Sequence, residues 1–116
     1  MEQNAVLEKS FAFSVRIVNL YKYMCATKKE FVLSKQLLRC GTSIGANVAE
    51  AQRGQSKADF RAKMNIALKE AYETDYWLRL LYETEYIEEK AYNSMSQDNE
   101  ELISLLISIC KSAEAK

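Results

Sequence analysis

The sequence predicts an all-α fold, an antiparallel up-down four-helix bundle formed by residues 1–116 as a single domain. Apolar residues recur at intervals of three and four along four segments, which is the spacing of a helix face. Leu, Ala, Glu, Lys and Gln, which favour helices, are abundant. The chain has only three glycines and no proline, whereas a β-rich fold of this size would need more turn-forming residues.

The first segment is expected to run from about Ala5 to Cys25, with Asn4 as its N-cap. Two apolar lines follow it at helical spacing. One line consists of Leu7, Phe11, Val15, Val18 and Cys25, and the second consists of Phe13, Ile17, Leu20 and Met24. The break between this segment and the next is expected at residues 26–29.

The second segment is expected to span residues 30–53 and to have two adjoining apolar faces. Its core stripe consists of Leu33, Leu37, Ile44, Val48 and Ala51, and the adjoining face consists of Leu38, Gly41, Gly45 and Ala49. Glycine inside a helix costs about 1 kcal/mol relative to alanine. Two glycines four residues apart therefore predict close backbone packing at that face.

The third segment begins with an N-terminal signal, because Ser56 can cap a helix while Asp59 stands in its positively polarised first turn. It is expected to run to Glu83. Its core face consists of Phe60, Met64, Ala67, Ala71, Leu78 and Tyr82, and the opposite side carries Ala62, Ile66, Tyr76, Trp77 and Leu80.

Residues 84–88 are expected to form a turn before a fourth helix over residues 89–113, with fraying near residues 94–98. Its stripe consists of Ala91, Met95, Leu102, Leu106, Ile109 and Ala113. Residues 102–110 alternate partly and are rich in β-branched side chains, so a strand is the alternative there. Helix is favoured, because a lone strand would have no partner.

Apolar second faces on the second, third and fourth helices exceed what the single interior of a four-helix bundle can hide. A contiguous exposed apolar patch usually marks an interaction site. Each copy carries the same patch, so self-association is the simplest way to cover it. The sequence therefore predicts a homo-oligomer.

The residues needed for common chemistry are missing, so we expect neither an enzyme nor a cofactor nor a metal. The chain has no histidine, no CxxC pair, no phosphate-binding loop and no GxSxG motif. Cys25, Cys40 and Cys110 are expected to be reduced core residues. No apolar run approaches the ~20 residues that cross a bilayer, and the N-terminus does not resemble a signal peptide. A cytoplasmic location is expected.

Charge is balanced overall but unevenly spread. Residues 1–63 hold eleven Lys or Arg against five Asp or Glu, and residues 64–116 hold the reverse. The pattern is either chance over solvated faces or a basic surface on the first two helices that faces an acidic neighbour or a polyanion. The candidate contacts to RNA or DNA are Lys22, Lys28, Lys29, Lys35, Arg53, Lys57, Arg61 and Lys63.

A polar stripe on the second helix borders its apolar faces. It consists of Gln36, Arg39, Ser43, Asn47 and Glu50, and Glu73 on the third helix lies similarly among apolar residues. Three interpretations are open: an ordinary solvated face, a hydrogen-bond network that fixes helix register or subunit contacts, or a ligand site. We expect Arg39 and Glu73 to be partly buried and paired across helices or subunits, because unpaired buried polar groups cost about 1–3 kcal/mol.

Two runs, SKQLLRCGTSIGANVAEAQ at 34–52 and SKADFRAKMNIALKEAYETDYWLRLL at 56–81, resemble the bacterial four-helix-bundle proteins also called 23S rRNA intervening-sequence proteins. The matching positions are Gln36, Leu37, Arg39, Ser43, Ile44, Ala46, Asn47, Ala49, Glu50, Phe60, Ile66, Ala67, Glu73 and Leu78. Many members have glycine at the position of Ala51 and serine at that of Glu70, so any surface role of those positions is in doubt.

The resemblance implies an up-down bundle and a homo-oligomer, often a pentameric ring. A relative of this family is the accessory variability determinant of diversity-generating retroelements, a basic pentamer that binds nucleic acid and assists a reverse transcriptase. The expected function is a non-enzymatic, pentameric assembly that is structural or binds protein partners. The alternative is a nucleic-acid-binding accessory protein, although the pI of about 6.3 is low for one.

Overall fold

The computed structural model describes the backbone of residues 2–114 and the side chains of residues 4–114. Within that range the chain forms four α-helices and one π-helical turn, with no strand. They are α1 (Glu2–Tyr23), η1 (Met24–Lys28), α2 (Leu33–Ala51), α3 (Lys57–Glu83) and α4 (Glu89–Glu114). The prediction of an all-α fold with four long helices is confirmed, and residues 102–110 are helical.

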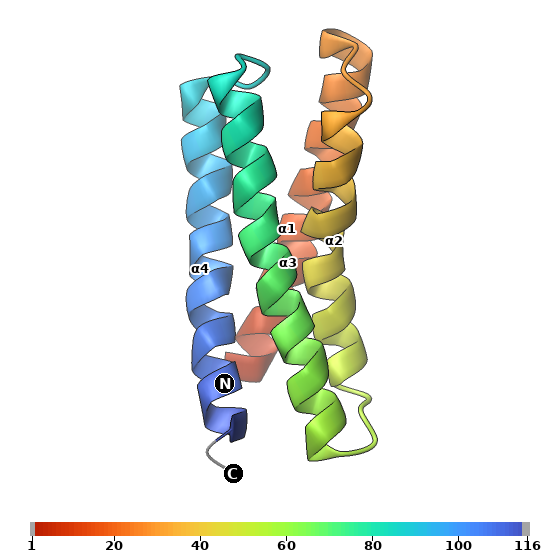
Figure 1. Cartoon of the computed structure of the whole chain (residues 1–116), viewed down its shortest axis with the longest axis vertical. Helices are drawn as coiled ribbons and strands as arrows, with labels where there is room; N and C mark the ends of the chain where they lie inside the picture. Colours follow the sequence, from red (N-terminus) through yellow and green to blue (C-terminus); the bar gives the residue numbers. More distant parts are fainter. Residues whose placement is uncertain (1, 115–116) are drawn as a thin grey trace.

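The helices pack into an elongated body of 46 × 21 × 19 Å. α2 packs against α1 and α3, and α4 packs against α3 and, less extensively, α1. The α1–α2 and α3–α4 turns lie at one end of the body, and the α2–α3 turn lies at the other end with the start of α1 and the end of α4 (Figure 1). Each end of the body therefore brings together residues that are far apart in the sequence.

Several predicted boundaries were right and others were wrong. The Ser56 hydroxyl accepts a hydrogen bond from the Asp59 amide at 3.1 Å, and α3 ends at Glu83, as expected. Asn4 lies inside α1 instead of capping it. Residues 94–98 are helical and show no fraying. α2 begins at Leu33 and not at Glu30, because a π-helical turn and Lys29, with φ of 54°, intervene.

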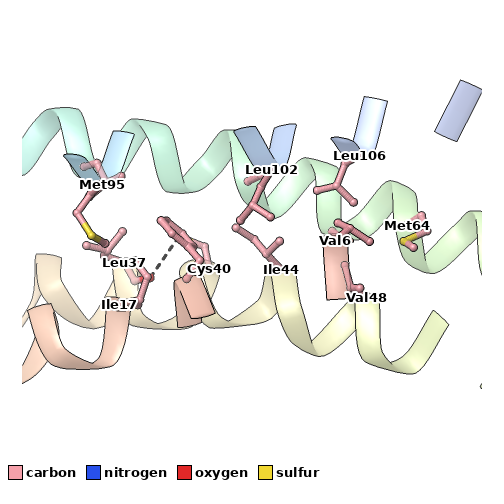
Figure 2. Close-up of a cluster of buried hydrophobic side chains, with 14 of the residues drawn as sticks. Val6, Ile17, Leu37, Cys40, Ile44, Val48, Met64, Met95, Leu102 and Leu106 are labelled. Atoms are coloured by element: carbon pink, nitrogen blue, oxygen red, sulfur yellow. Dashed lines mark hydrogen bonds between the residues drawn. The ribbon is translucent and has the colours of Figure 1, made fainter. Parts of the chain in front are cut away.

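The core is built from all four helices (Figure 2), and it selects one of the two apolar lines of α1. Phe13, Ile17 and Met24 of the second line are buried. In the first line Phe11 is 71% exposed, and Leu7, Val15 and Val18 are exposed as well. The interior thus leaves the α1 part of the first line facing outward, while Cys25 in η1 is half-buried.

Close approach of α1 and α2 explains this choice and confirms the packing predicted from the glycines. A Cβ atom on Gly41 would stand 2.8 Å from the Ile17 side chain. A Cβ on Gly45 would stand 3.1 Å from the carbonyl oxygen of Ser10. Both distances are shorter than ordinary van der Waals contact, so only glycine fits without displacing a neighbour.

Glu30 is buried at the start of α2 and caps it with its side chain. Its carboxylate accepts hydrogen bonds from the amides of Val32, Leu33 and Ser34, at 3.1, 3.0 and 2.7 Å. Burial opposes ionisation, but the hydrogen bonds outweigh it and hold the pKa of Glu30 below its ordinary value. A charged acceptor at a helix N-terminus also interacts favourably with the helix dipole. Glu30 therefore holds the α1–α2 turn in a defined shape.

Candidate functional site

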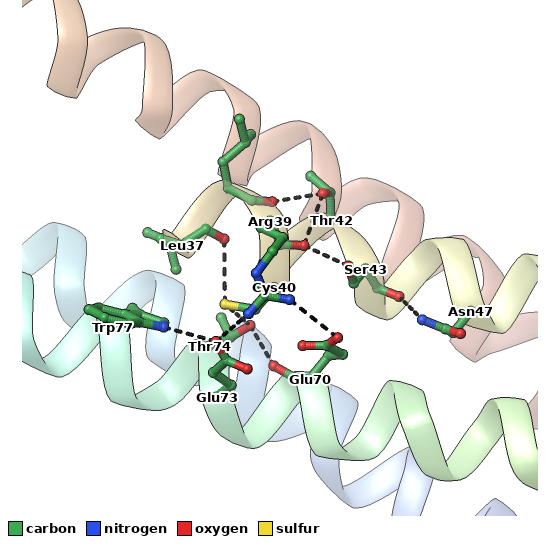
Figure 3. A network of polar contacts seen from close by, with 11 residues as sticks. Leu37, Arg39, Cys40, Thr42, Ser43, Asn47, Glu70, Glu73, Thr74 and Trp77 are labelled. Atoms are coloured by element: carbon green, nitrogen blue, oxygen red, sulfur yellow. Dashed lines mark hydrogen bonds and ion pairs between the residues drawn. The ribbon is translucent and has the colours of Figure 1, made fainter. Parts of the chain in front are cut away.

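Part of the polar stripe joins α2 to α3. The Arg39 guanidinium donates a hydrogen bond to the Glu73 carboxylate and lies 3.5 Å from that of Glu70 (Figure 3). The Trp77 indole N–H donates to the same Glu73 oxygen at 3.1 Å. The hydrogen bond to Glu73 raises the pKa of Arg39, and the bonds from Trp77 and Arg39 lower the pKa of Glu73. Glu70 and Trp77 were not identified as partners from the sequence.

A buried polar contact lies beneath this ion pair. The Thr74 hydroxyl donates to the Glu70 carbonyl at 2.8 Å and lies 3.4 Å from the Cys40 sulfur. Burial raises the pKa of the Cys40 thiol to about 11, so this thiol stays protonated at neutral pH. Cys40 and Cys110 are buried, Cys25 is half-buried and all three are free.

The other stripe residues do not extend the network between helices. Ser43 donates to the Arg39 carbonyl and Asn47 donates to the Ser43 carbonyl, both within α2. Glu50 forms an ion pair of 3.0 Å with Lys63 on α3. Gln36 is exposed and makes no side-chain hydrogen bond within the described residues. The stripe therefore contains two separate contacts between α2 and α3.

Replacing Arg39 by alanine is expected to lower the free energy of unfolding of an isolated chain by about 1 kcal/mol or less, because exposed ion pairs contribute little to stability. The Arg39 and Glu73 side chains are 51% and 37% exposed, well short of the burial that would justify a larger effect. Glu73 would also keep the bond from Trp77. Thermal denaturation and light scattering of Arg39→Ala, with exposed Arg79→Ala as the control, measure the effect.

A larger loss of stability, or a loss of assembly, that occurred in Arg39→Ala but not in Arg79→Ala would indicate that Arg39 lies in a subunit contact. Melting and assembly like those of the parent chain would reduce the stripe to a solvated face.

The eight candidate nucleic-acid contacts lie in two groups along the bundle. Lys22, Lys28, Lys29 and Lys35 surround the α1–α2 turn, and Arg53, Lys57, Arg61 and Lys63 surround the α2–α3 turn. These turns lie at opposite ends (Figure 1), separated by the 19 residues of α2, about 28 Å at 1.5 Å per residue. Lys63 is also paired with Glu50. The candidates therefore form two groups, one at each end of α2, and their contact with a nucleic acid stays a prediction.

Other charges of the basic half are matched by the acidic half of the same chain. Lys9 on α1 lies 3.1 Å from Glu101 on α4. Arg16 pairs with Asp98 and donates to the Ser94 hydroxyl at 2.9 Å. For α1, the acidic neighbour that the charge distribution suggested is α4.

Exposed apolar side chains form two outward faces. The α1 apolar face consists of Leu7, Phe11, Val15 and Val18, and the α3 apolar face consists of Tyr72 and Tyr76, which lie four residues apart. The α1 apolar face adjoins α2, because Ser14 stands between Phe11 and Val18 and approaches Gly45 closely. The second faces expected on α2 and α4 are largely used inside the bundle. The most exposed large apolar side chains lie on α1, on α3, as expected for that helix, and at the α1–α2 turn.

Among the described residues no group of three or more His, Cys, Asp or Glu side chains is placed to hold a metal. A shallow groove of about 200 Å³ between α1 and α4 is lined by Lys9, Ala12, Phe13, Asp98, Glu101 and Leu102.

No helix in the described part of the chain is both long and apolar enough to traverse a bilayer.

Comparison with known proteins places the chain in a family. The sequence model of the 23S rRNA-intervening sequence protein family matches residues 2–108. The structure is similar to that of a protein with unknown function from the S23 ribosomal protein family of Bacteroides thetaiotaomicron, with 59% identity and a TM-score of 0.94. The similarity covers 96% of this chain and 99% of that one. No curated protein matches. The chain belongs to the 23S rRNA-intervening sequence protein family.

Proposed function

We propose that this protein is a non-catalytic, cytoplasmic homo-oligomer, a pentamer as the family resemblance implies, whose subunit is an antiparallel up-down bundle. Its role is structural: copies pack through their outer faces, and the assembled surface binds protein partners. The observation that carries the proposal is the pair of apolar faces on α1 and α3.

The two faces offer more apolar surface than scattered exposed residues would. Phe11 is 71% exposed within a line of four apolar residues on one side of α1, and Tyr76 is 61% exposed one turn after Tyr72 on α3. Such contiguous patches mark interaction sites in soluble proteins. If the α1 apolar face of one copy packed against the α3 apolar face of the next, two different surfaces would meet. Such a heterologous contact can be repeated from copy to copy until it closes into a ring.

Light scattering at micromolar concentration tests the proposal. The expected mass is several times the 13.3 kDa of one chain. A mass near that of one chain would contradict the proposal and would leave the apolar faces to a different partner.

A nucleic-acid-binding accessory role is the second candidate. The family name refers to 23S rRNA, and Lys22, Lys28, Lys29 and Lys35 are exposed around one turn. The described residues contain no base-reading motif or recognised RNA fold, so binding would rest on phosphate contacts and would not depend on sequence.

Titration of labelled RNA and DNA at two salt concentrations tests this role. Affinity should fall by at least about tenfold as salt rises from about 50 to 200 mM, because binding releases counterions. Absence of binding at the lower salt concentration would remove this candidate. Tight binding that survived the higher salt concentration and preferred one sequence would reveal a specific site.

A further inference from the structure

Two oppositely charged turns lie at the same end of the bundle (Figure 1). The lysine turn, between α1 and α2, carries Lys22, Lys28, Lys29 and Lys35. The glutamate turn, between α3 and α4, carries Glu83, Glu85, Glu88 and Glu89. All eight side chains are exposed, and none takes part in an ion pair among the described residues. One exposed lysine, Lys90, adjoins the four glutamates, which leaves the glutamate turn with a net negative charge. The chain thus presents two complementary charged surfaces that its own fold leaves unused.

The lysine turn also has a hydrogen-bonded backbone and two exposed apolar side chains. Phe31 and Val32 at its tip are 54% and 71% exposed. Their backbone is held by the Glu30 carboxylate, which binds the amide of Val32 and the two amides that follow. A fixed turn with an exposed apolar pair among lysines suits an acidic partner surface, because little conformational freedom is lost on docking.

Each charged turn continues an apolar face. Lys22 follows Val18 by four residues and lies on the same side of α1, and Glu83 follows Tyr76 by seven and lies on the same side of α3. A contact between the α1 apolar face of one copy and the α3 apolar face of the next, with parallel bundle axes, would therefore bring the lysine turn against the glutamate turn.

The opposite orientation brings like charges together. With antiparallel axes the lysine turn would meet the start of α3 and the turn before it, where Arg53, Lys57 and Arg61 outnumber the carboxylate of Asp59 and where Lys63 is paired with Glu50. Like charges placed across an interface disfavour that arrangement, whereas complementary charges fix register. Charge therefore selects the parallel arrangement of copies.

We propose that the lysine turn of each subunit binds the glutamate turn of a second copy, and that this contact sets the parallel register of the assembly. The proposal rests on the homo-oligomer proposed above and names the partner of the lysine turn. It also implies that these lysines are paired with glutamates of the neighbouring copy in the assembly and cannot bind a nucleic acid there.

Charge reversal tests the contact. We expect Lys28→Glu/Lys29→Glu and, separately, Glu83→Lys/Glu85→Lys to weaken assembly about 10- to 100-fold at about 50 mM salt. All four changes in one chain should restore assembly, because the charges are then exchanged and still opposite. Sedimentation across a concentration series measures the association, and circular dichroism checks that each variant is folded.

A matched control carries the same change of charge at the other end. Arg53→Glu/Lys57→Glu, in the α2–α3 turn, should assemble like the parent chain. If the lysine-turn variant and the glutamate-turn variant each assembled like the parent, the proposed contact between the turns would be wrong, while the homo-oligomer would remain.

A lysine-turn variant that lost RNA binding but kept its assembly would assign these lysines to nucleic acid and overturn the contact. A parent chain that was monomeric would contradict the proposed function itself, which is a separate result.

Discussion

Replacing Phe11 and Val15 by glutamate is expected to convert the proposed oligomer into a folded monomer. Both residues lie in the α1 apolar face, with 71% and 46% of their surface exposed in a single copy. Covering each in a subunit contact contributes about 1–3 kcal/mol. A glutamate at either position would place an unpaired carboxylate in that contact, which costs further free energy. Together these terms predict an association at least about a hundredfold weaker.

The subunit itself should survive the two substitutions. Neither side chain contributes to the core, to which α1 supplies Val6, Phe13 and Ile17. Glutamate is a good helix former, so α1 should keep its conformation. Light scattering should then give the mass of one chain while circular dichroism retains the helical signal and cooperative melting of the parent.

A control with the same charge change separates the apolar face from a general charge effect. Gln97→Glu/Ser104→Glu adds two carboxylates at exposed positions of α4. This variant should assemble like the parent. An oligomer that persisted in Phe11→Glu/Val15→Glu would show that the copies do not meet through the α1 apolar face.

Replacing Glu30 by alanine is expected to produce the largest loss of stability from a single change at a turn, about 2–3 kcal/mol at pH 7. Three backbone amides of α2 would lose their acceptor, and the position is buried, so water would replace the carboxylate poorly. For a chain of this size the melting temperature should fall by about 10 °C. Glu30→Gln keeps an acceptor oxygen without the charge and should lose about half as much.

The effect of Glu30 should depend on pH in one direction. Its pKa in the folded chain is lower than its ordinary value, so its contribution is complete above the pKa of the unfolded chain. The contribution is lost as pH falls through the lowered pKa of the folded chain. The stability difference between the parent and Glu30→Gln should therefore be constant near neutral pH and shrink below about pH 4.

Urea denaturation at pH 7, 5, 4 and 3 measures this dependence. Glu100→Ala, at an exposed position of α4, is the control and should change stability little at any of these pH values. A difference between the parent and Glu30→Gln that stayed constant down to pH 3 would show that the cap acts through its shape and not through its charge.

Local patterns were enough to predict four helices, the Ser56 cap and the end of α3. Helix periodicity and capping depend on residues within a few positions of one another, so spacing alone reports them. The cap formed by Glu30 was not predicted, because the sequence pattern placed this residue inside the second helix and not before it. Glu30 continues the helical pattern of α2, and only the π-helical turn before it places its carboxylate on the amides that follow.

The sequence suggested that Arg39 and Glu73 pair across helices, as they do, but it did not identify Glu70 and Trp77 as further partners. Arg39 was selected because it borders an apolar face, but its neighbours Glu70 and Glu73 lie more than thirty positions away in the sequence. Which residues meet across two helices depends on their relative rotation and displacement, and no spacing within one helix encodes those quantities. The division of the basic residues into two groups likewise follows from the length and path of α2.

The sequence by itself determined that this protein is all-helical, that α2 approaches a neighbour closely at its glycines, and that apolar surface is in excess. The tertiary structure decided where the excess lies. α1 has two apolar lines of similar character, and its own sequence does not rank them. Gly41 and Gly45 of α2 admit Ile17 and the backbone of Ser10 at close range, and this fit turns the Ile17 line inward. The Phe11 line is left outside, because a helix cannot turn both lines toward one interior.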